Sequence, residues 1–268
     1  MPNVHTNGID LYYEVTGSGE PLVLIAGLGY GLWMWHKMVP GLARHFQVIA
    51  FDNRGAGQSS KPDGSYSAPM MAADTAGLID ALGLRGAAVM GHSMGGFIAQ
   101  QLVLDRPDLV GKLILSATNF GGPHHVPVTP EAMAVILDRS GDPIDVVKRG
   151  IAVACAPGFI DAHPELVEEL VAYRLTGPVP PAQYQAQTAV GIGLMSEAAC
   201  FEHRLKDVTA PTLILFGEHD KVVPPANAEL LAQQIPGSRI VILPGAGHMF
   251  PIEAPEAAVE AITAFLEK

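Results

Sequence analysis

The feature that most constrains the fold is a series of short, continuously apolar runs that recur along the chain. The runs occupy residues 22–26, 48–51, 87–90, 113–115, 212–216 and 240–243. Continuous apolarity, rather than alternation, is typical of strands that are covered on both faces, as in a parallel sheet. An earlier segment, residues 9–15, alternates more and is typical of an edge strand.

Helical patterns lie between these runs, at residues 33–45, 69–82, 95–105, 226–234 and 255–267. This order predicts the α/β class, with a doubly wound, mostly parallel sheet. This alternation of strand and helix patterns stops in the proline-rich segment 119–205. That segment has helical patterns at 131–139 and 164–174 but no convincing apolar strand. We therefore expect a core formed by residues 1–118 and 206–268. Residues 119–205 are expected to form a helical cap over the carboxyl edge of the sheet.

Composition narrows the possible partners and compartment. The 268 residues are 49% hydrophobic, enough for one large core, and the net charge is −11 without a block of Lys or Arg. This argues against nucleic acid or an anionic membrane surface as a partner. The first residues lack the pattern of a signal peptide, and no apolar run approaches the roughly 20 residues that span a bilayer. Cys155 and Cys200 are the only cysteines, so we expect reduced thiols in a cytoplasmic protein. We expect this protein to be a monomer or a homodimer.

Residues 91–95 read Gly-His-Ser-Met-Gly, between an apolar run and a helical pattern. This is the G-x-S-x-G pattern in its strand–turn–helix context. Gly91 and Gly95 lack the Cβ atoms that would crowd a sharp turn, and Ser93 is expected to adopt a strained backbone conformation there. A serine on such a turn projects its hydroxyl beyond the sheet, beside free backbone N–H groups. The pattern therefore predicts that Ser93 is a nucleophile, with His92 packed behind the turn.

Two later runs are followed by polar side chains that can complete such a site. Asp220 follows the run 212–216, with Glu218 and His219 beside it, and His248 follows the run 240–243. A serine hydroxyl is a weak nucleophile at neutral pH and needs a neighbouring base. Parallel strands bring their carboxyl ends to one edge, so these side chains are expected near Ser93. As an alternative, Asp220 is a turn residue before a proline.

Together these motifs resemble those of the α/β-hydrolase fold family, and the resemblance covers nearly the whole chain outside 119–205. Residues 51–59 are similar to the D-x-R-G-x-G-x-S run of many members, and Gly27-Leu28-Gly29 matches the loop that supplies half of the oxyanion hole. The resemblance implies a helical cap inserted after the sixth strand. One position departs from the family pattern, because Ala26 stands where many relatives have His. The imidazole that usually helps to steady this loop is therefore missing here.

The resemblance also implies a role for each residue. Ser93 attacks a carbonyl carbon, His248 takes the serine proton, and Asp220 orients the imidazole. The backbone N–H groups of Leu28 and Met94 bind the developing oxyanion. Some relatives carry the acid after the earlier strand, but residues 116–119 read Ser-Ala-Thr-Asn, which favours Asp220. No metal and no organic cofactor is implied.

We expect a serine hydrolase that cleaves a carboxylic ester or lactone of a small, mostly apolar substrate through an acyl-enzyme. The chain is most similar to the carboxylesterase and 3-oxoadipate enol-lactone hydrolase branch. Trp33, Trp35 and Met249 are candidates to line the substrate pocket, although burial against the sheet is an equal alternative. Two other functions stay open: a C–C bond hydrolase of the meta-cleavage-product type, and a ligand receptor that keeps the triad.

Overall fold

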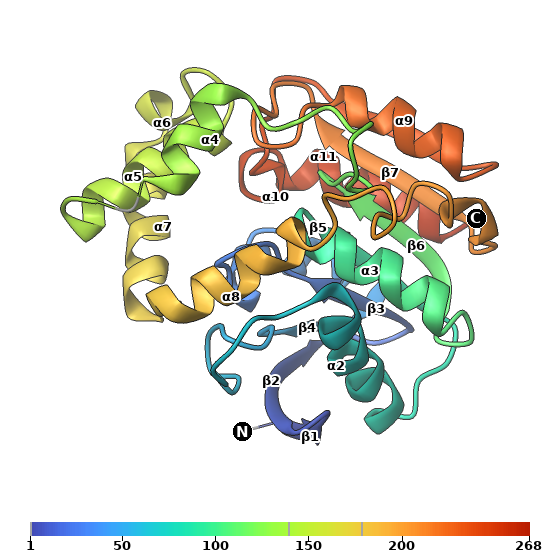
Figure 1. Ribbon diagram of the computed structural model, residues 1–268. Coiled ribbons are helices and arrows are strands. Elements are labelled where there is room, and N and C mark those ends of the chain that lie inside the picture. The colour runs from blue at the N-terminus through green and yellow to red at the C-terminus, as the bar shows by residue number, and fades with distance from the viewer. Residues whose placement is uncertain (1, 139, 178) are drawn as a thin grey trace.

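The computed structural model describes residues 2–138, 140–177 and 179–268, and an eight-stranded sheet lies at its centre (Figure 1). The strand order is β1-β2-β4-β3-β5-β6-β7-β8. β2 pairs antiparallel with β1 and β4, whereas the pairs from β4 to β8 are parallel. The strands are β1 (Asn3–Thr6), β2 (Ile9–Thr16), β3 (Glu20–Ile25), β4 (Phe46–Phe51), β5 (Ala87–His92), β6 (Val110–Ser116), β7 (Thr212–Gly217) and β8 (Arg239–Leu243). The expected mostly parallel α/β sheet is confirmed.

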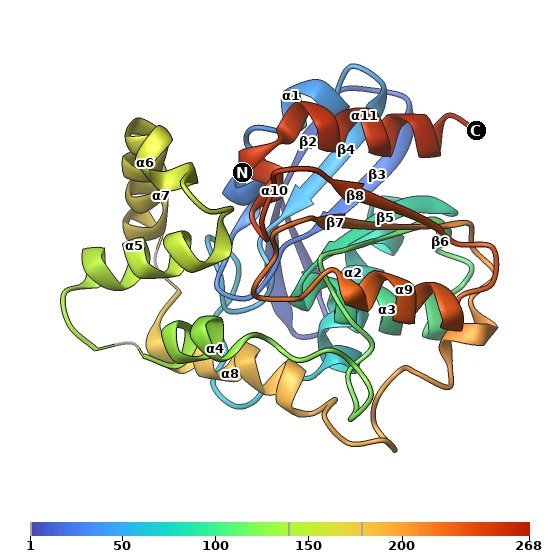
Figure 2. The ribbon, with the colours of Figure 1, turned by 90° about the horizontal axis from the view of Figure 1, so that it is seen from above.

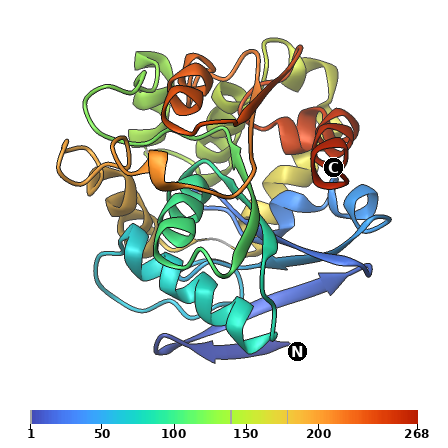
Figure 3. The same cartoon turned by 90° about the vertical axis from the view of Figure 1, so that its right-hand side faces the viewer.

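The edge of the sheet differs from the expectation, because residues 9–15 do not form the edge strand. β1 pairs outside β2, and Figure 3 shows this hairpin in dark blue at the bottom of the molecule. Asn7 and Gly8 connect the two strands with φ angles of 47° and 75°. Positive φ at both central positions defines the type I′ turn, for which Asn-Gly is a preferred sequence. That dipeptide was the available signal for the additional strand.

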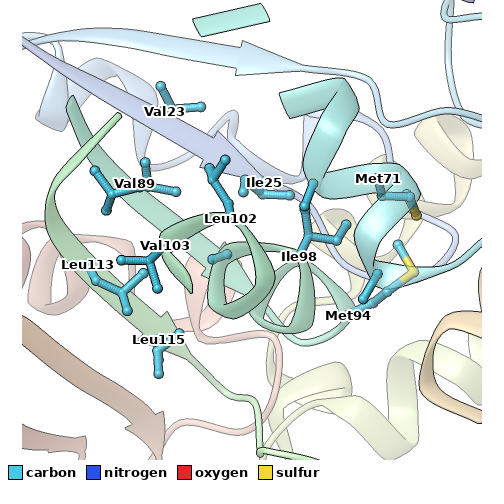
Figure 4. Close-up of a cluster of buried hydrophobic side chains, with 14 of the residues drawn as sticks. Val23, Ile25, Met71, Val89, Met94, Ile98, Leu102, Val103, Leu113 and Leu115 are labelled. Carbon is cyan, nitrogen blue, oxygen red and sulfur yellow. The ribbon is translucent and has the colours of Figure 1, made fainter. Parts of the chain in front are cut away.

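Helices cover both faces of the sheet (Figure 2). One face carries α2 (Ala68–Ala81), α3 (Met94–Asp105) and α9 (Ala226–Gln234), and the other carries α1 (Val39–Leu42) and α11 (Pro255–Leu266). Along β3, Val23 and Ile25 join the core under α3, which Figure 4 shows, whereas Leu22 and Leu24 join the core under α11. Burial on both faces explains why the strands are apolar throughout.

The expected helix over residues 33–45 is interrupted. A 3-10 helix, η1 (Leu32–Trp35), comes first, and the short α1 follows with Pro40 in its first turn. Proline is favoured in a first turn and disfavoured further along a helix, so a new helix begins there. Trp35 and Leu42 are nevertheless fully buried, so the apolar positions serve the same core.

The segment between β6 and β7 holds a group of helices that we call the cap, on the left in Figure 1. These are α4 (Pro130–Leu137), α5 (Pro143–Ala154), α6 (Phe159–Ala162), α7 (Pro164–Thr176) and α8 (Pro181–Ile192). Most begin with a proline in the first turn, so prolines that punctuate the sequence are helix starts. Of the pattern 131–139, Arg139 lies outside the described residues.

Two short elements complete the chain, η2 (Leu205–Asp207) before β7 and α10 (Phe250–Glu253) before α11. Among the described helices, none combines the length and the apolar character that crossing a membrane requires.

Candidate active site

Ser93 lies on the sharp turn between β5 and α3. Its backbone has φ 56° and ψ −119°, a conformation that residues other than glycine rarely adopt. A Cβ atom on Gly91 would lie 2.2 Å from the carbonyl oxygen of Gly95. A Cβ atom on Gly95 would lie 2.2 Å from the carbonyl oxygen of Ile25. Both positions therefore require glycine, and the close packing holds Ser93 at the carboxyl end of β5.

Asp220 and His248 come together from the ends of β7 and β8. The imidazole Nδ1 lies 2.7 Å from Oδ2 of Asp220. The other carboxylate oxygen accepts hydrogen bonds from the backbone N–H groups of Val222 and Val223, each at 2.8 Å. The side chains of Asp220 and His248 are 0% and 8% exposed. Because the carboxylate is fixed by backbone donors, the bond to Nδ1 fixes the imidazole and leaves Nε2 available to another partner.

The loop after β3 lies against the serine turn. The Tyr30 N–H donates to the Gly27 carbonyl at 3.3 Å, which closes a β-turn with φ 73° at Gly29. A Cβ atom on Gly27 would lie 3.2 Å from the Cβ of Ser93, so glycine permits this close approach. Leu28, at the next position, lines the same cavity as Ser93. We call residues 27–30 the oxyanion turn, after the role expected for Leu28 from the sequence.

The segment after β4 holds the oxyanion turn from behind. Asn53 Nδ2 donates to the carbonyl oxygen of Ala26 at 3.0 Å. Asp52 accepts hydrogen bonds from the backbone N–H groups of Leu32 and Gln58, each at 2.7 Å. In this chain, side chains from the loop after β4 therefore steady the backbone on both sides of the oxyanion turn.

A cavity of about 100 Å³ lies between the core loops and the cap, and both Ser93 and His248 form part of its wall. The core also contributes Gly27, Leu28, Tyr30, His92 and Val222, and the cap contributes Val135, Ile136, Gly150, Val153, Ala154, Arg174 and Tyr184. The volume is below the roughly 300–1,000 Å³ common for ligand pockets. The enclosed space beside Ser93 is therefore small in this arrangement of the cap.

The structure corrects the expected pocket residues, since Trp33, Trp35 and Met249 are not among the described residues that line this cavity. Trp35 is fully buried in the core under α11. Trp33 stacks on Tyr173 of α7, with ring centroids 5.3 Å apart, and Met249 packs in a cluster with α5 and α7. Burying a large apolar side chain is worth about 1.5–3 kcal/mol, which favours the core over a cavity wall.

Tyr30, Arg174 and Tyr184 line the cavity but carry no motif in the sequence. Tyr30 directly follows Gly29, so its place in the loop was the only available signal. The other two come from α7 and α8, whose packing over the sheet no local pattern predicts. The Arg174 guanidinium lies over the Tyr30 ring, with Cζ 4.1 Å from its centroid, in cation–π geometry.

His92 packs behind the serine turn, as expected. Its Nδ1 lies 2.8 Å from Oγ of Ser116, and its ring centroid lies 4.8 Å from that of His248. Burial lowers the pKa of the His92 imidazole well below its ordinary value of 6.5, and the neighbouring His248 acts in the same direction. His92 is therefore kept neutral.

The loop that carries His248 is tied to the cap through Glu253 of α10. One carboxylate oxygen of Glu253 accepts from the backbone N–H of Ala156 at 2.6 Å and from that of Gly247 at 3.1 Å. Burial raises the pKa of Glu253, and these two backbone donors act in the opposite direction. The position of the imidazole therefore depends on contact between the core and the end of α5.

The adjacent His124 and His125 each lie within hydrogen-bond distance of a neighbouring group. His124 Nδ1 lies 2.8 Å from Oε2 of Glu202, and His125 Nδ1 lies 2.7 Å from the Gly122 carbonyl oxygen. Within residues 2–138, 140–177 and 179–268, no three His, Cys, Asp or Glu side chains are grouped so that they could hold a metal ion.

Comparison with known proteins adds to this geometry. A family model described as the alpha/beta hydrolase fold matches residues 20–255. A poly(3-hydroxyalkanoate) depolymerase from Ectopseudomonas oleovorans is 33% identical over 250 residues, which cover 92% of this chain and 84% of that protein. A solved thermophilic esterase from Thermogutta terrifontis is 30% identical with a TM-score of 0.82, covering 100% of this chain and 98% of that one. The solved enol-lactonase from Burkholderia xenovorans LB400 is 25% identical with a TM-score of 0.83, covering 100% of both chains.

Proposed function

Because the chain belongs to the α/β-hydrolase fold family, we propose that it is a serine hydrolase that cleaves a carboxylic ester or lactone of a small, mostly apolar substrate. The observation that carries this proposal is the cavity wall shared by Ser93 and His248, with Asp220 bonded to the imidazole behind it. A nucleophile, a base and an orienting acid at one cavity are the parts that acyl transfer needs.

The proposed reaction has two halves. Ser93 Oγ forms a bond to the substrate carbonyl carbon while His248 Nε2 takes the hydroxyl proton. The imidazolium then delivers that proton to the leaving alkoxide oxygen, and the acyl group stays on Ser93. Water attacks the acyl-enzyme, His248 again takes a proton and returns it to Ser93 Oγ, and the carboxylic acid leaves.

Charge develops on the carbonyl oxygen in both halves. The backbone N–H groups of Leu28 and Met94 are the proposed donors, since Met94 begins α3 and Leu28 lies in the oxyanion turn against Ser93. Removing one such donor from a serine protease costs about 100- to 1,000-fold in kcat. Asp220 stabilises the imidazolium that forms at the same time.

The cavity supports a short acyl group as the preferred substrate part. Its volume is about 100 Å³, and Val135, Ile136, Val153 and Val222 make much of its wall apolar. The esterase and the enol-lactonase among the similar structures are consistent with ester or lactone chemistry. These observations support our proposal that the chain belongs to the carboxylesterase and enol-lactone hydrolase branch.

The experiment combines covalent labelling with turnover. A fluorophosphonate should label the wild type and not Ser93→Ala, and p-nitrophenyl acetate and butyrate should be hydrolysed only by the wild type. Ser18→Ala, at an exposed turn between β2 and β3, is the matched control and should behave as wild type. Absence of both labelling and turnover in the wild type overturns the proposal.

Two further measurements separate the other two functions. Cleavage of a dienoate diketone that far exceeds the hydrolysis of any ester or lactone would establish a C–C bond hydrolase. A ligand that binds tightly, with turnover slower than about one event per minute against the usual 1–10³ per second, would establish a receptor.

A further inference from the structure

The oxyanion turn is held from the cap as well as from the core. The Gly29 N–H donates to Oε1 of Gln187, on α8, at 2.9 Å. The Gly29 carbonyl oxygen accepts a hydrogen bond from Nη1 of Arg174, on α7. Both peptide groups that flank Gly29 are therefore bonded to side chains that lie far away in the sequence.

Gln187 is built into this contact rather than resting on the surface. The residue is 1% exposed, and its Nε2 donates to the carbonyl oxygen of Arg54 at 3.0 Å. The two ends of one amide thus satisfy an N–H group in one core loop and a carbonyl group in another. Turning the amide over would place donor against donor and acceptor against acceptor in a buried site, which is costly.

The bond to Gly29 acts on the most adjustable part of a β-turn. In the oxyanion turn, Leu28 and Gly29 are the central residues, and a positive φ at the second of them only is the pattern of a type II turn. In such a turn, the central peptide group differs in orientation from that of a type I turn. Gln187 accepts from the N–H of that central peptide, so it holds the turn in one form.

We propose that Gln187 is a positioning residue for the oxyanion turn: by fixing the Leu28–Gly29 peptide while α8 is seated against the core, it holds the turn as a whole, and with it the preceding peptide that carries the Leu28 N–H, against Ser93. This inference rests on the proposed function, since it assigns Gln187 a role in the same reaction. Gln187 touches no reacting atom and acts through Gly29. Seating of the cap and assembly of the oxyanion hole are then one event.

Gln183 provides a matched control one turn earlier on α8. It is also buried, and its Nε2 donates to the carbonyl oxygen of Lys61 at 3.3 Å, away from the oxyanion turn. Replacing either glutamine with methionine removes one buried cap-to-core contact at nearly constant volume. Only Gln187→Met also frees the Gly29 N–H.

The test measures p-nitrophenyl acetate hydrolysis and the affinity of a short alkyl trifluoromethyl ketone, which adds to a serine and forms an oxyanion. Losing a whole oxyanion donor costs 100- to 1,000-fold, so for Gln187→Met we expect kcat to fall about 10- to 100-fold with KM within about threefold. Affinity for the ketone should fall by the same factor as kcat/KM. Gln183→Met should change each quantity by less than about threefold.

Gln187→Glu is the second variant. A protonated carboxyl group repeats both hydrogen bonds of the amide, and burial favours the neutral form. Its activity relative to wild type should therefore rise toward one as the pH is lowered, whereas that of Gln187→Met should stay low. The pH dependence of Gln187→Glu relative to wild type decides the matter even when Gln187→Met does not fold.

Equal losses in Gln187→Met and Gln183→Met would overturn the inference, as would a fall in kcat without a matching fall in ketone affinity. A ratio of Gln187→Glu to wild type that stays low at every pH would also overturn it. These outcomes all presuppose an active wild type. A wild type that hydrolyses no ester and takes no fluorophosphonate label overturns the proposed function instead.

Discussion

The His248 imidazole is held by a single carboxylate oxygen, and the rest of that carboxylate is held by the backbone. Asp220 Oδ2 lies 2.7 Å from Nδ1, while Oδ1 accepts two backbone N–H groups. An asparagine would keep the shape of the side chain, but it can present an N–H group to Nδ1 and so stabilise the wrong tautomer. Asp220→Asn should therefore lower kcat about 10,000-fold with little change in KM.

Glu218→Gln is the control for that measurement. Glu218 follows the same strand, is exposed, and accepts a hydrogen bond from the Gly245 N–H at 2.9 Å. It should retain nearly the full kcat for p-nitrophenyl acetate. A large loss there, with little loss in Asp220→Asn, would show that the acid has been assigned to the wrong residue.

Buried His92 should make the protein sensitive to acid. Its pKa is lowered by burial, so below about pH 6.5 the unfolded chain binds a proton at this position that the folded chain does not. The free energy of unfolding therefore falls as the pH falls, by up to about 1.4 kcal/mol per pH unit from this group. Chemical denaturation should show that the free energy of unfolding of the wild type is lower at pH 5.5 than at pH 7. In His92→Gln this decrease should be about 1 kcal/mol smaller.

Exposed His203 supplies the comparison. His203→Gln should leave the difference in stability between pH 7 and pH 5.5 as it is in wild type. An unchanged difference in His92→Gln would mean that the acid sensitivity arises elsewhere.

Residues whose position depends on the local chain could be placed from the sequence, and those that depend on long-range packing could not. Glycine is required on both sides of Ser93 because added Cβ atoms would collide with nearby backbone. At Gly91 the collision is with the first turn of the following helix, and at Gly95 it is with the neighbouring strand β3. Asp220 and His248 follow strands, so the sheet brings them to one edge. The direction of Trp33 or Trp35 depends instead on what covers the loop, and the sequence alone does not say that α7 stacks on Trp33.

At the scale of elements, a buried ion pair joins the loop after β4 to α2. Arg54 Nε and Nη2 lie 2.5 Å and 2.6 Å from the two carboxylate oxygens of Asp74, and both side chains are buried. Burial raises the pKa of Asp74, and the bond to Arg54 opposes that rise. Arg54→Met would leave a buried carboxylate with one remaining side-chain donor, from Asn7 at 2.7 Å.

We expect Arg54→Met to lower the free energy of unfolding by about 3–5 kcal/mol in urea denaturation. The double variant Arg54→Met with Asp74→Leu should recover part of this loss, because no unpaired charge is then buried. Arg106→Met, which breaks exposed pairs with Asp80 and Asp108, should have little effect. If Arg54→Met and Arg106→Met lowered the free energy of unfolding by comparable amounts, burial of the ion pair would be ruled out as the cause.

Long periodic elements followed from the sequence, whereas short or interrupted ones did not. The pattern at 226–234 coincides with α9, because an amphipathic helix of that length is specified locally. The interruption between η1 and α1 depends on a proline within an otherwise apolar stretch. β1 was missed because four half-exposed residues carry little pattern, and only the turn at Asn7 and Gly8 marks it.

At the scale of the whole molecule, the cavity beside Ser93 belongs to neither the sheet nor the cap alone. Ile136 on α4 closes the cavity opposite the core residues, while its neighbour Leu137 is 66% exposed. Ile136→Ala should enlarge the space beside Ser93. One methylene in an apolar pocket is worth about 10- to 200-fold in specificity, so the ratio of kcat/KM for p-nitrophenyl octanoate to that for acetate should rise at least about tenfold.

Leu137→Ala changes the same helix without touching the cavity and should leave that ratio unchanged. An equal change in both variants would indicate that α4 moves as a whole, rather than that Ile136 limits the length of the acyl group.

The most direct measurement is mass spectrometry of the protein quenched in acid during turnover of p-nitrophenyl butyrate. If Ser93 is the nucleophile, one butyryl group should be found on the peptide that contains Ser93, and it should be absent from Ser93→Ala. Butyrylation of a residue other than Ser93 would contradict the proposed acyl-enzyme. So would a protein that stays unmodified during rapid turnover, once a separate experiment has established that deacylation is slow.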